Sequence, residues 1–156
     1  MNSIAQRIQA QFPEHLIDAR EAFGELTLQL RREGIAEVCR FLRDDPDLAF
    51  DHITDICSVD YPEDEERFEV VYHFYSIRKR HRIRVKARLP EEDCTIDSLT
   101  GLWRGANFLE REVYDMMGIR FNHHPDLRRI LLTDDFDGYP LRKDFPLEDQ
   151  TREDKN

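Results

Sequence analysis

The sequence predicts an α+β domain, a mixed or antiparallel sheet with helices packed on one face, followed by an extended C-terminal segment. Two adjacent stretches separated by a short turn predict strands, residues 68–77 by their apolar composition and residues 82–89 by their alternation. Apolar residues at helical spacing occur both before and after them. With 156 residues the chain is long enough for one domain with a substantial core. Alternation of helices and hairpins along the chain is typical of the α+β class.

The first thirty residues predict a helix followed by a hairpin. Residues 4–12 carry apolar side chains on one helical face, and Pro13 ends that helix. Residues 17–23 and 25–30 flank Gly24 and predict the two arms of a hairpin. The second arm alternates leucine with polar residues, which indicates one buried face.

The central part of the chain predicts one more helix and the main strands. Residues 35–42 have apolar side chains on one helical side, and residues 50–61 are expected to be partly extended. Residues 68–77 are apolar on both faces, as expected of an interior strand. Residues 82–89 alternate strictly between apolar and cationic side chains, so one face of that strand is buried and the other is cationic. Residues 78–81 form the expected turn between them.

The last third of the chain predicts a helix and then a segment without regular period. Ser98 is expected to cap a helix that runs to Gly118, with a break at Gly105. Residues 1–121 then form the α+β domain, and residues 122–150 form an extended segment that docks on a partner. Residues 151–156 are polar and expected to be disordered.

Composition excludes some functions and leaves others open. The formal net charge of -10 disfavours non-specific binding of nucleic acid. Residues 78–88 nevertheless contain seven Lys or Arg residues and no acid. The cationic face within them is either solvated or a contact for an anionic partner. An RNA-reading sheet would require aromatic side chains on that face, and it has none.

The cysteines and the absence of apolar spans indicate the compartment. Cys39, Cys57 and Cys94 are far apart without a CxxC motif, which disfavours disulfide scaffolds and thiolate metal clusters and fits a reducing compartment. No window approaches 18 consecutive apolar residues, and the N-terminus lacks the pattern of a signal peptide. We therefore expect a cytosolic chain that reaches a membrane only through partners.

Two groups of residues could carry chemistry. His123, His124 and Asp126 are a minimal metal-ligand set without helical spacing, and the favoured interpretation is a turn in which Asp126 caps residues 127–132. Glu110 belongs to a charged helix face that could do acid–base work, but the sequence offers no nucleophile or oxyanion donors to accompany it. Structural pairing, including an i, i+4 pair of Arg111 with Asp115, or recognition of a partner, is favoured instead.

The segment after this helix has the composition of a protein-binding surface. Residues 126–129 and 141–144 mix Arg or Lys with carboxylates in an irregular backbone, and Phe136, Tyr139 and Phe145 lie among them. Guanidinium groups suit bidentate pairing at interfaces, and aromatic side chains serve as anchors there. The sequence thus predicts binding to a protein rather than catalysis by this chain alone.

The same region carries a family resemblance. Residues 110–121 read Glu-Arg-Glu-Val-Tyr-Asp-Met-Met-Gly-Ile-Arg-Phe, residues 124–131 read His-Pro-Asp-Leu-Arg-Arg-Ile-Leu, and residues 138–146 read Gly-Tyr-Pro-Leu-Arg-Lys-Asp-Phe-Pro. These blocks resemble the 30 kDa subunit, also called the C subunit, of the respiratory NADH:quinone oxidoreductase (complex I). Val70-Val71-Tyr72-His73 and the strand at 82–86 fit the sheet of that family. The resemblance spans roughly residues 15–147.

The chain departs from the family pattern at a few positions. His123 stands where the family usually has Gly, so a non-glycine residue is expected to adopt a positive φ or the turn to differ. Thr133, Phe136 and Phe145 replace a more typical Pro, Trp and Tyr, which affects packing details. The chain ends soon after the last block, as in the free-standing form rather than the form fused to the large quinone-site subunit.

The resemblance implies a non-catalytic structural subunit of the peripheral arm of the proton-translocating enzyme. It would lie on the cytoplasmic side of the bacterial inner membrane and pack against the large quinone-site subunit and its neighbouring iron–sulfur subunit. FMN and the iron–sulfur clusters would belong to partner subunits, and this chain would hold no cofactor, metal or catalytic residue. The residues expected at the partner interface are Glu110, Arg111, Asp115, Arg128, Arg129, Arg142, Lys143 and Asp144.

Three alternatives remain at this point. The chain could be the homologous small subunit of a membrane-bound energy-converting hydrogenase or related dehydrogenase, because the electron donor is decided by other chains. It could be a free-standing module that binds an anionic partner through residues 82–88. A hydrolase built on His123, His124 and Asp126 is the third.

Overall fold

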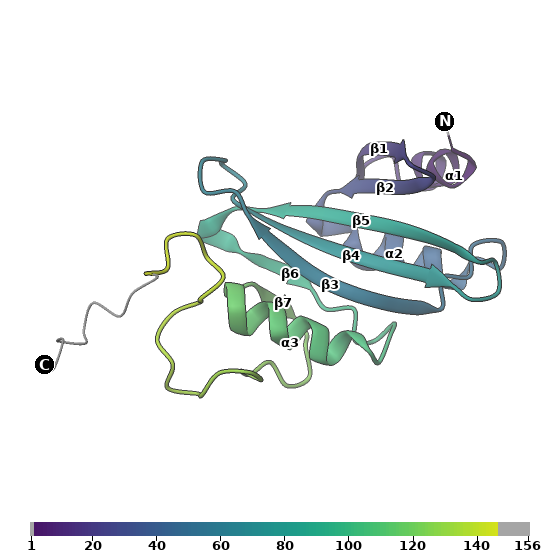
Figure 1. Ribbon diagram of the computed structural model, residues 1–156. Coiled ribbons are helices and arrows are strands. Elements are labelled where there is room, and N and C mark those ends of the chain that lie inside the picture. The colour runs from purple at the N-terminus through teal and green to yellow at the C-terminus, as the bar shows by residue number, and fades with distance from the viewer. Residues whose placement is uncertain (1, 147–156) are drawn as a thin grey trace, which may run out of the picture.

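The computed structural model describes residues 2–146 and confirms the α+β class. A five-stranded mixed sheet has the order β1-β2-β5-β4-β3, and a second, two-stranded sheet pairs β6 with β7 (Figure 1). The strands are β1 (Leu16–Ala22), β2 (Glu25–Leu30), β3 (His52–Asp60), β4 (Phe68–Ser76), β5 (His81–Leu89), β6 (Thr95–Asp97) and β7 (Arg120–Asn122). The helices are α1 (Ser3–Gln11), α2 (Ile35–Asp44) and α3 (Ala106–Met117), with short 3₁₀ turns at η1 (Arg32–Gly34) and η2 (Glu91–Asp93).

The predicted strand pattern is confirmed in the middle of the sheet. β4 lies between β3 and β5 and pairs antiparallel with both, while β2 runs parallel to β5. Ile83, Val85, Ala87 and Leu89 of β5 are all buried, and the cationic residues between them are not. Burial of one strand face by period-two alternation therefore fixes the register of this sheet.

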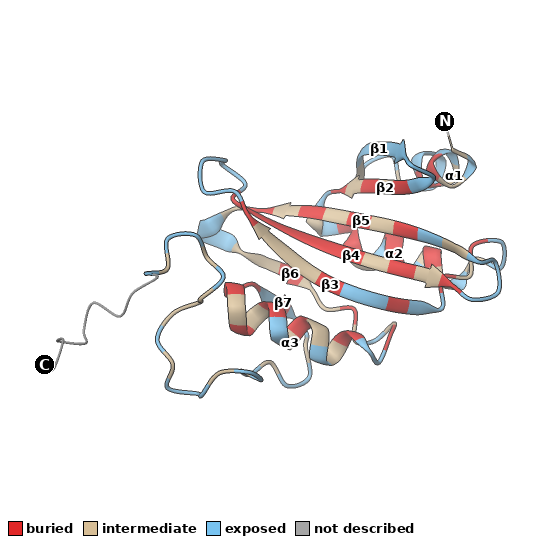
Figure 2. Cartoon of the chain, viewed as in Figure 1, coloured by how far each residue is buried: buried red, intermediate tan, exposed pale blue. Residues whose placement is uncertain are grey.

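The helices pack on one face of the sheet, as predicted. The hydroxyl of Tyr72, on β4, lies within electrostatic reach of Cys39 on α2 and of Glu110 on α3. The ring of Phe74, on the same strand face, lies 4.7 Å from the ring of Trp103, whose Nε1 donates to the carbonyl of Phe50 at 3.1 Å. The core thus lies between this face of the sheet and the helices (Figure 2).

Both N-terminal helices form where the sequence predicts them. The side chain of Asn2 caps α1 by accepting from the amide of Ile4 at 2.8 Å, and α1 ends at Gln11, before Pro13. On α2 the buried residues are Ile35, Val38, Cys39 and Leu42. Burial of one apolar stripe stabilises each of these short helices, which would be marginal in isolation.

The predicted helix start at Ser98 is wrong, because α3 begins only at Ala106. Residues 98–103 form turns instead, in which the amides of Leu102 and Trp103 both donate to the carbonyl of Leu99. The carboxylate of Glu110 accepts from the amide of Leu99 and the hydroxyl of Ser98, each at 2.7 Å. Glu110 therefore accepts a hydrogen bond from the Leu99 amide, which would have no partner within the first turn of a helix that began at Ser98.

The end of α3 and the strand after it complete the folded part of the chain that precedes the C-terminal segment, here called the body. Gly118 has a left-handed φ of 79°, so the predicted stop is confirmed. β7 follows at once and pairs parallel with β6, a small sheet that the sequence does not predict. Residues 122–146, here called the C-terminal segment, contain no helix and no strand beyond the last residue of β7, and they run along α3 (Figure 1). The domain boundary at residues 121/122 stays a prediction, and the expected disorder of residues 151–156 concerns residues outside the described range.

Candidate functional site

The C-terminal segment is attached to the body by two buried carboxylates, of which the first is Asp115 on α3. Its side chain is fully buried, and Oδ2 accepts the backbone N–H groups of Ile130, Leu131 and Leu132 at 3.1, 2.7 and 2.9 Å. Oδ1 accepts from the guanidinium of Arg129 at 2.8 Å. Burial raises the pKa of Asp115, but the three N–H donors and Arg129 outweigh it and hold the pKa below its ordinary value.

Arg129 joins this anchor to the rest of the segment. It also donates to the carbonyl of Asp115 at 3.0 Å and to that of Gly138 at 2.9 Å. Its guanidinium lies 5.6 Å from the ring centroid of Phe136 and 5.1 Å from that of Tyr139. Charge-assisted bonds and cation–π contacts of this kind are stronger where water is excluded. Arg129 therefore folds the segment around one buried ion pair.

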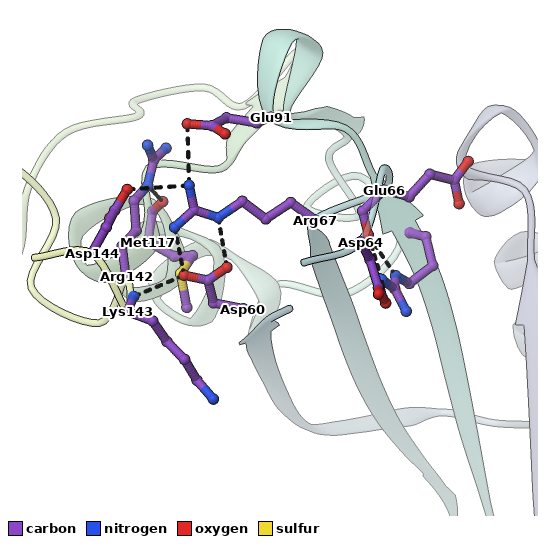
Figure 3. A network of polar contacts seen from close by, with 10 residues as sticks. Asp60, Asp64, Glu66, Arg67, Glu91, Met117, Arg142, Lys143 and Asp144 are labelled. Carbon is purple, nitrogen blue, oxygen red and sulfur yellow. Dashed lines mark hydrogen bonds and ion pairs between the residues drawn. The ribbon is translucent and has the colours of Figure 1, made fainter. Parts of the chain in front are cut away.

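The second anchor is Asp60, the last residue of β3 (Figure 3). Its carboxylate accepts two bonds from Arg67, at 2.7 and 2.8 Å, and one from the amide of Lys143 at 2.8 Å. Arg67 also reaches Asp144 and Glu91, each at 3.2 Å. The bonds from Arg67 lower the pKa of Asp60 below its ordinary value despite burial. One buried arginine thus links the sheet, the loop after β5 and the C-terminal segment.

Arg142 holds the segment against the end of α3. Its Nε donates to the carbonyl of Met117 at 2.7 Å, and its guanidinium lies 4.8 Å from the ring centroids of both Phe68 and Tyr139. A Cβ atom at Gly118 would lie 2.6 Å from Arg142 Nη2 and 2.8 Å from the Tyr139 ring. Glycine at this position is therefore required both by the helix stop and by the close approach of the segment.

The predicted pairing of Arg111 with Asp115 is wrong. Arg111 donates instead to the backbone carbonyls of Arg128 and Arg129, at 3.1 and 3.2 Å. Asp115 is engaged by Arg129 and the three amides that follow it. Carbonyl acceptors for Arg111, and N–H and guanidinium donors for Asp115, all from the C-terminal segment, therefore replace the helical pairing of these two side chains.

Glu110 lies inside the body, not on an exposed charged face. Its carboxylate is fully buried and is bound by Ser98 and Leu99, and burial raises its pKa to about 7. The hydroxyl of Tyr72 nearby is buried and has no hydrogen-bond partner among the described residues. Glu110 thus orders the turns before α3 by accepting the amide of Leu99 and the hydroxyl of Ser98.

The predicted interface residues divide into two groups. The side chains of Glu110, Asp115 and Arg129 are directed into this chain, and Arg111 and Arg142 bond its carbonyls. Arg128, Lys143 and Asp144 are exposed. Within the last group, the Asp144 carboxylate still pairs with the buried Arg67 at 3.2 Å. The sequence thus does not indicate in which direction each of these side chains points.

His123, His124 and Asp126 do not converge on one point. The Nε2 of His124 lies 3.2 Å from the carbonyl of Asn107, and its Nδ1 accepts from the amide of Asp126 at 2.9 Å. The Asp126 carboxylate pairs with Arg128 at 2.9 Å. Capping of residues 127–132 by Asp126 is therefore wrong, since Asp115 has that role. The expected positive φ at His123 is confirmed at 67°.

The cationic face of β5 is neutralised by acids from neighbouring elements. Arg84 pairs with Glu25 at 3.1 Å, Lys86 with Glu69 at 3.6 Å and Arg88 with Asp64 at 2.8 Å. Arg82 lies 5.6 Å from the ring centroid of Tyr75. Because its charges are already compensated, this face has little attraction left for an anionic partner. The structure thus weakens the alternative of a free-standing anion-binding module.

Comparison with known proteins identifies the family. The chain matches the family described as the respiratory-chain NADH dehydrogenase 30 Kd subunit over residues 28–151. It is 48% identical over 153 residues to the C subunit of the NADH-quinone oxidoreductase of Geobacter sulfurreducens, covering 97% of this chain and 93% of that protein. It is 50% identical over 147 residues to the C subunit of the same enzyme of Hyphomonas neptunium, covering 94% of this chain and 72% of that protein.

Solved structures agree with the fold. The trypsin-resistant fragment (1-134) of Nqo5 superposes with a TM-score of 0.68 at 34% identity, covering 80% of this chain and 99% of the fragment. A chain of an archaeal membrane-bound sulfane sulfur reductase has a TM-score of 0.77 at 23% identity, covering 97% of this chain and 95% of that one, and shows the fold alone. Among residues 2–146, no helix has the length and apolar character needed to cross a membrane. The chain belongs to the family of the 30 kDa subunit of the respiratory-chain NADH dehydrogenase, complex I.

Proposed function

We propose that this chain is a structural subunit of the peripheral arm of the proton-translocating NADH:quinone oxidoreductase and has no catalytic centre of its own. In this proposal it packs against the large quinone-site subunit and the neighbouring iron–sulfur subunit, on the cytoplasmic side of the bacterial inner membrane. Electrons pass from NADH through FMN and iron–sulfur clusters of those partners to quinone. The relatives from Geobacter sulfurreducens and Hyphomonas neptunium support membership of such an assembly.

The observation that carries the proposal is the position of exposed apolar side chains. Of the eight large apolar side chains exposed within residues 2–146, four lie on α3 or the C-terminal segment. They are Phe108, Ile130, Leu131 and Leu141. Large apolar side chains that are exposed among polar residues are a feature of protein–protein contacts. We call the exposed outer side of α3 and of the C-terminal segment the docking surface.

Hydrogen bonds within this chain hold the backbone of the docking surface in place. Leu131 and Ile130 donate their amides to Asp115, and the amide of Leu141 donates to the carbonyl of Met116 at 3.0 Å. Arg128 and Lys143 place exposed cations beside these apolar groups. A preordered surface loses little conformational entropy on binding, which favours a stable contact. These features support an interface in which apolar anchors are surrounded by charged residues.

The test is co-purification from detergent-solubilised membranes with an N-terminally tagged chain that replaces the native one. The variant Arg128→Ala with Leu131→Ala removes one exposed cation and one large apolar side chain from the docking surface. We expect recovery of the large quinone-site subunit to fall at least tenfold, about 1.4 kcal/mol of binding free energy, together with membrane NADH:quinone activity. Neither side chain is buried, so the free energy of unfolding of the isolated chain should change by less than about 1 kcal/mol.

A matched control removes one exposed aliphatic side chain and one exposed arginine at the turn between β4 and β5. Ile77 is 63% exposed, as Leu131 is 62% exposed, and Arg78 is exposed beside it. Ile77→Ala with Arg78→Ala should leave recovery and activity unchanged. Equal loss in both variants, or none in the first, contradicts the proposal. Recovery of hydrogenase-type partners instead of NADH-oxidising ones would assign the chain to the related complexes.

A further inference from the structure

The face of the sheet opposite the helices brings together three side chains that the docking surface does not use. Asp55 and Cys57 lie on β3 two residues apart, and Asp55 pairs across the ladder with His73 on β4. One carboxylate oxygen, the thiol sulfur and one imidazole nitrogen of these residues all lie within 4.8 Å of one another. Cys57 and His73 are half-buried and Asp55 is exposed, so the group is open on one side.

The donors available here suit a borderline transition metal. We propose that Asp55, Cys57 and His73 form a binding site for one divalent ion of the zinc class, with water completing its coordination. Carboxylate oxygen, thiolate sulfur and imidazole nitrogen are the three protein ligands that Zn²⁺ takes, and three of them leave a fourth position open. Rigid cross-strand placement holds the three ligands without a loop having to close around the ion.

The chemistry of the three ligands fits this geometry. A neutral imidazole binds a metal ion through a ring nitrogen. Binding of the ion to Cys57 forms a metal–thiolate bond and releases the thiol proton to solvent. Within residues 2–146, no side-chain hydrogen bond or ion pair engages the Asp55 carboxylate or the Cys57 thiol.

Arg84 competes with the ion. Its Nε donates to His73 Nε2 at 3.2 Å, while its Nη1 and Nη2 contact Thr27 and Glu25 at 3.3 and 3.1 Å. An ion that binds His73 Nε2 must replace the hydrogen bond from Arg84, and an ion that binds Nδ1 requires the other tautomer of the ring. In either case Arg84 can keep its hydrogen bonds to Thr27 and Glu25. A cavity of about 410 Å³ beside Asp55 and His73 gives an ion access from solvent. Arg84 thus sets the affinity of the site without being a ligand.

The test is titration of the full-length chain with Co²⁺, followed by absorption spectroscopy and by competition with Zn²⁺. A thiolate-to-cobalt charge-transfer band that Zn²⁺ abolishes is expected at one ion per chain. Cys57→Ser should remove the band. Asp55→Asn and His73→Gln should each weaken Co²⁺ affinity by more than about 100-fold, the upper end of the loss caused by removing only an outer-shell partner. Arg84→Gln should strengthen the affinity, because the competing donor and its charge are gone.

Two controls separate this site from other potential ligands. Glu14, His15 and Glu37 also lie within 4.8 Å of one another, but they include no thiol, so His15→Gln should leave the band unchanged. Cys94→Ser should do the same, since its thiol donates to the Gly118 carbonyl at 3.4 Å. Absence of the band in the wild-type chain, or its persistence in Cys57→Ser, overturns the proposal.

A second measurement needs no variant and therefore does not depend on how a variant folds. Alkylation of Cys57 by iodoacetamide, followed by mass spectrometry, should be slowed at least tenfold by Zn²⁺. The rate at Cys94 should not change and serves as the internal reference. Equal rates at Cys57 with and without Zn²⁺ overturn the site irrespective of the spectra.

Discussion

Glu110 and Asp115 lie five residues apart on α3, and both carboxylates are fully buried. Their pKa values nevertheless shift in opposite directions. Glu110 is directed into the body, where two neutral donors do not offset burial, and its pKa rises to about 7. Asp115 is directed toward the C-terminal segment, where three amides and a guanidinium lower its pKa. Burial alone does not decide the charge of a carboxylate. The number and charge of its donors do.

The difference separates two functions of one helix. The half of α3 that contains Glu110 orders the turns at residues 98–103, and that contact tolerates a proton on the carboxyl group. The half that contains Asp115 holds the docking surface, and that contact depends on a negative charge. Four substitutions, and one hydrogen-exchange measurement, test this division, and the substitutions are ordered from the largest expected effect to the smallest.

Asp115→Asn should have the largest effect. The amide removes the charge opposite Arg129, and breaking one partner of a buried ion pair costs about 3–5 kcal/mol. Urea denaturation of the full chain should show this loss in the free energy of unfolding, and trypsin should cleave faster after Arg128 and Arg129. Glu112→Gln, an exposed carboxylate on the same helix, is the control and should change stability by less than about 0.5 kcal/mol. If Asp115→Asn lost as little stability as the control, the charge of Asp115 would not hold the C-terminal segment.

Glu110→Gln should remove a loss of stability that the wild-type chain shows as the pH rises. The folded pKa of about 7 exceeds the ordinary 4.5, so the folded state binds the proton more tightly. The free energy of unfolding therefore falls as pH rises from 4.5 to about 7. The group contributes at most about 3 kcal/mol to that fall. In Glu110→Gln this contribution should disappear, which urea denaturation across that range measures. An unchanged slope in the variant would show that another group causes it.

The contributions of Asp115 and Asp60 to stability depend on pH in the opposite direction to that of Glu110. Their pKa values are lowered in the folded state, so their contribution is present above the ordinary value of 3.8 and is lost as pH falls through the folded pKa. Acid should therefore release the C-terminal segment, whereas the contact of Glu110 should survive it. Hydrogen exchange of the Ile130–Leu132 amides against that of Leu99 would separate the two.

Gly118→Ala should have an intermediate effect. Alanine at a φ of 79° costs about 1–2 kcal/mol, and its Cβ would also displace Arg142 and Tyr139 from the end of α3. Thermal unfolding should show the loss, and cleavage after Arg142 should become faster. Gly101→Ala is the matched control, because its Cβ would meet nothing within 4 Å. Equal stability of the two variants would show that the segment is not held at the helix end.

Asp144→Asn should have the smallest effect. The Asp144 side chain is 63% exposed and adds one ion pair to Arg67, which already has two bonds to Asp60. Exposed ion pairs contribute about 0–1 kcal/mol, so urea denaturation should show a change in that range. A loss as large as that of Asp115→Asn would mean that the anchors act as one cooperative unit rather than separately.

Much of the fold could be predicted because its signals are local. Alternation in residues 82–89, the apolar stripe of α2 and the stop at Gly118 each report on burial or backbone conformation within a few residues. β6 and β7 are three residues long and carry no usable period. Residues 99–103 have apolar residues at helical spacing, but they form turns, and the amide of Leu99 donates to the Glu110 carboxylate.

The sequence groups the charged residues of the candidate site on α3 and the C-terminal segment, but it does not predict their contacts. The partner of a charged side chain can lie far away in sequence. Asp60 takes the amide of Lys143 from 83 residues away, and Glu25 takes Arg84 from 59 residues away. Only the folded backbone brings such pairs together, so no local pattern distinguishes an inward arginine such as Arg129 from an outward one such as Arg128.

The contact of Lys143 with Asp60 also bears on the order of events during synthesis. Asp60 ends β3 and Arg67 directly precedes β4, so the Lys143 contact needs these two strands to be paired, whereas Asp115 holds residues 129–132 independently. Loop-closure entropy makes contacts between residues so distant in sequence slow to form. Until the Lys143 contact forms, the proposed docking surface is not held in place at that end, so a partner that recognises it would bind the folded chain in preference to an incompletely folded one.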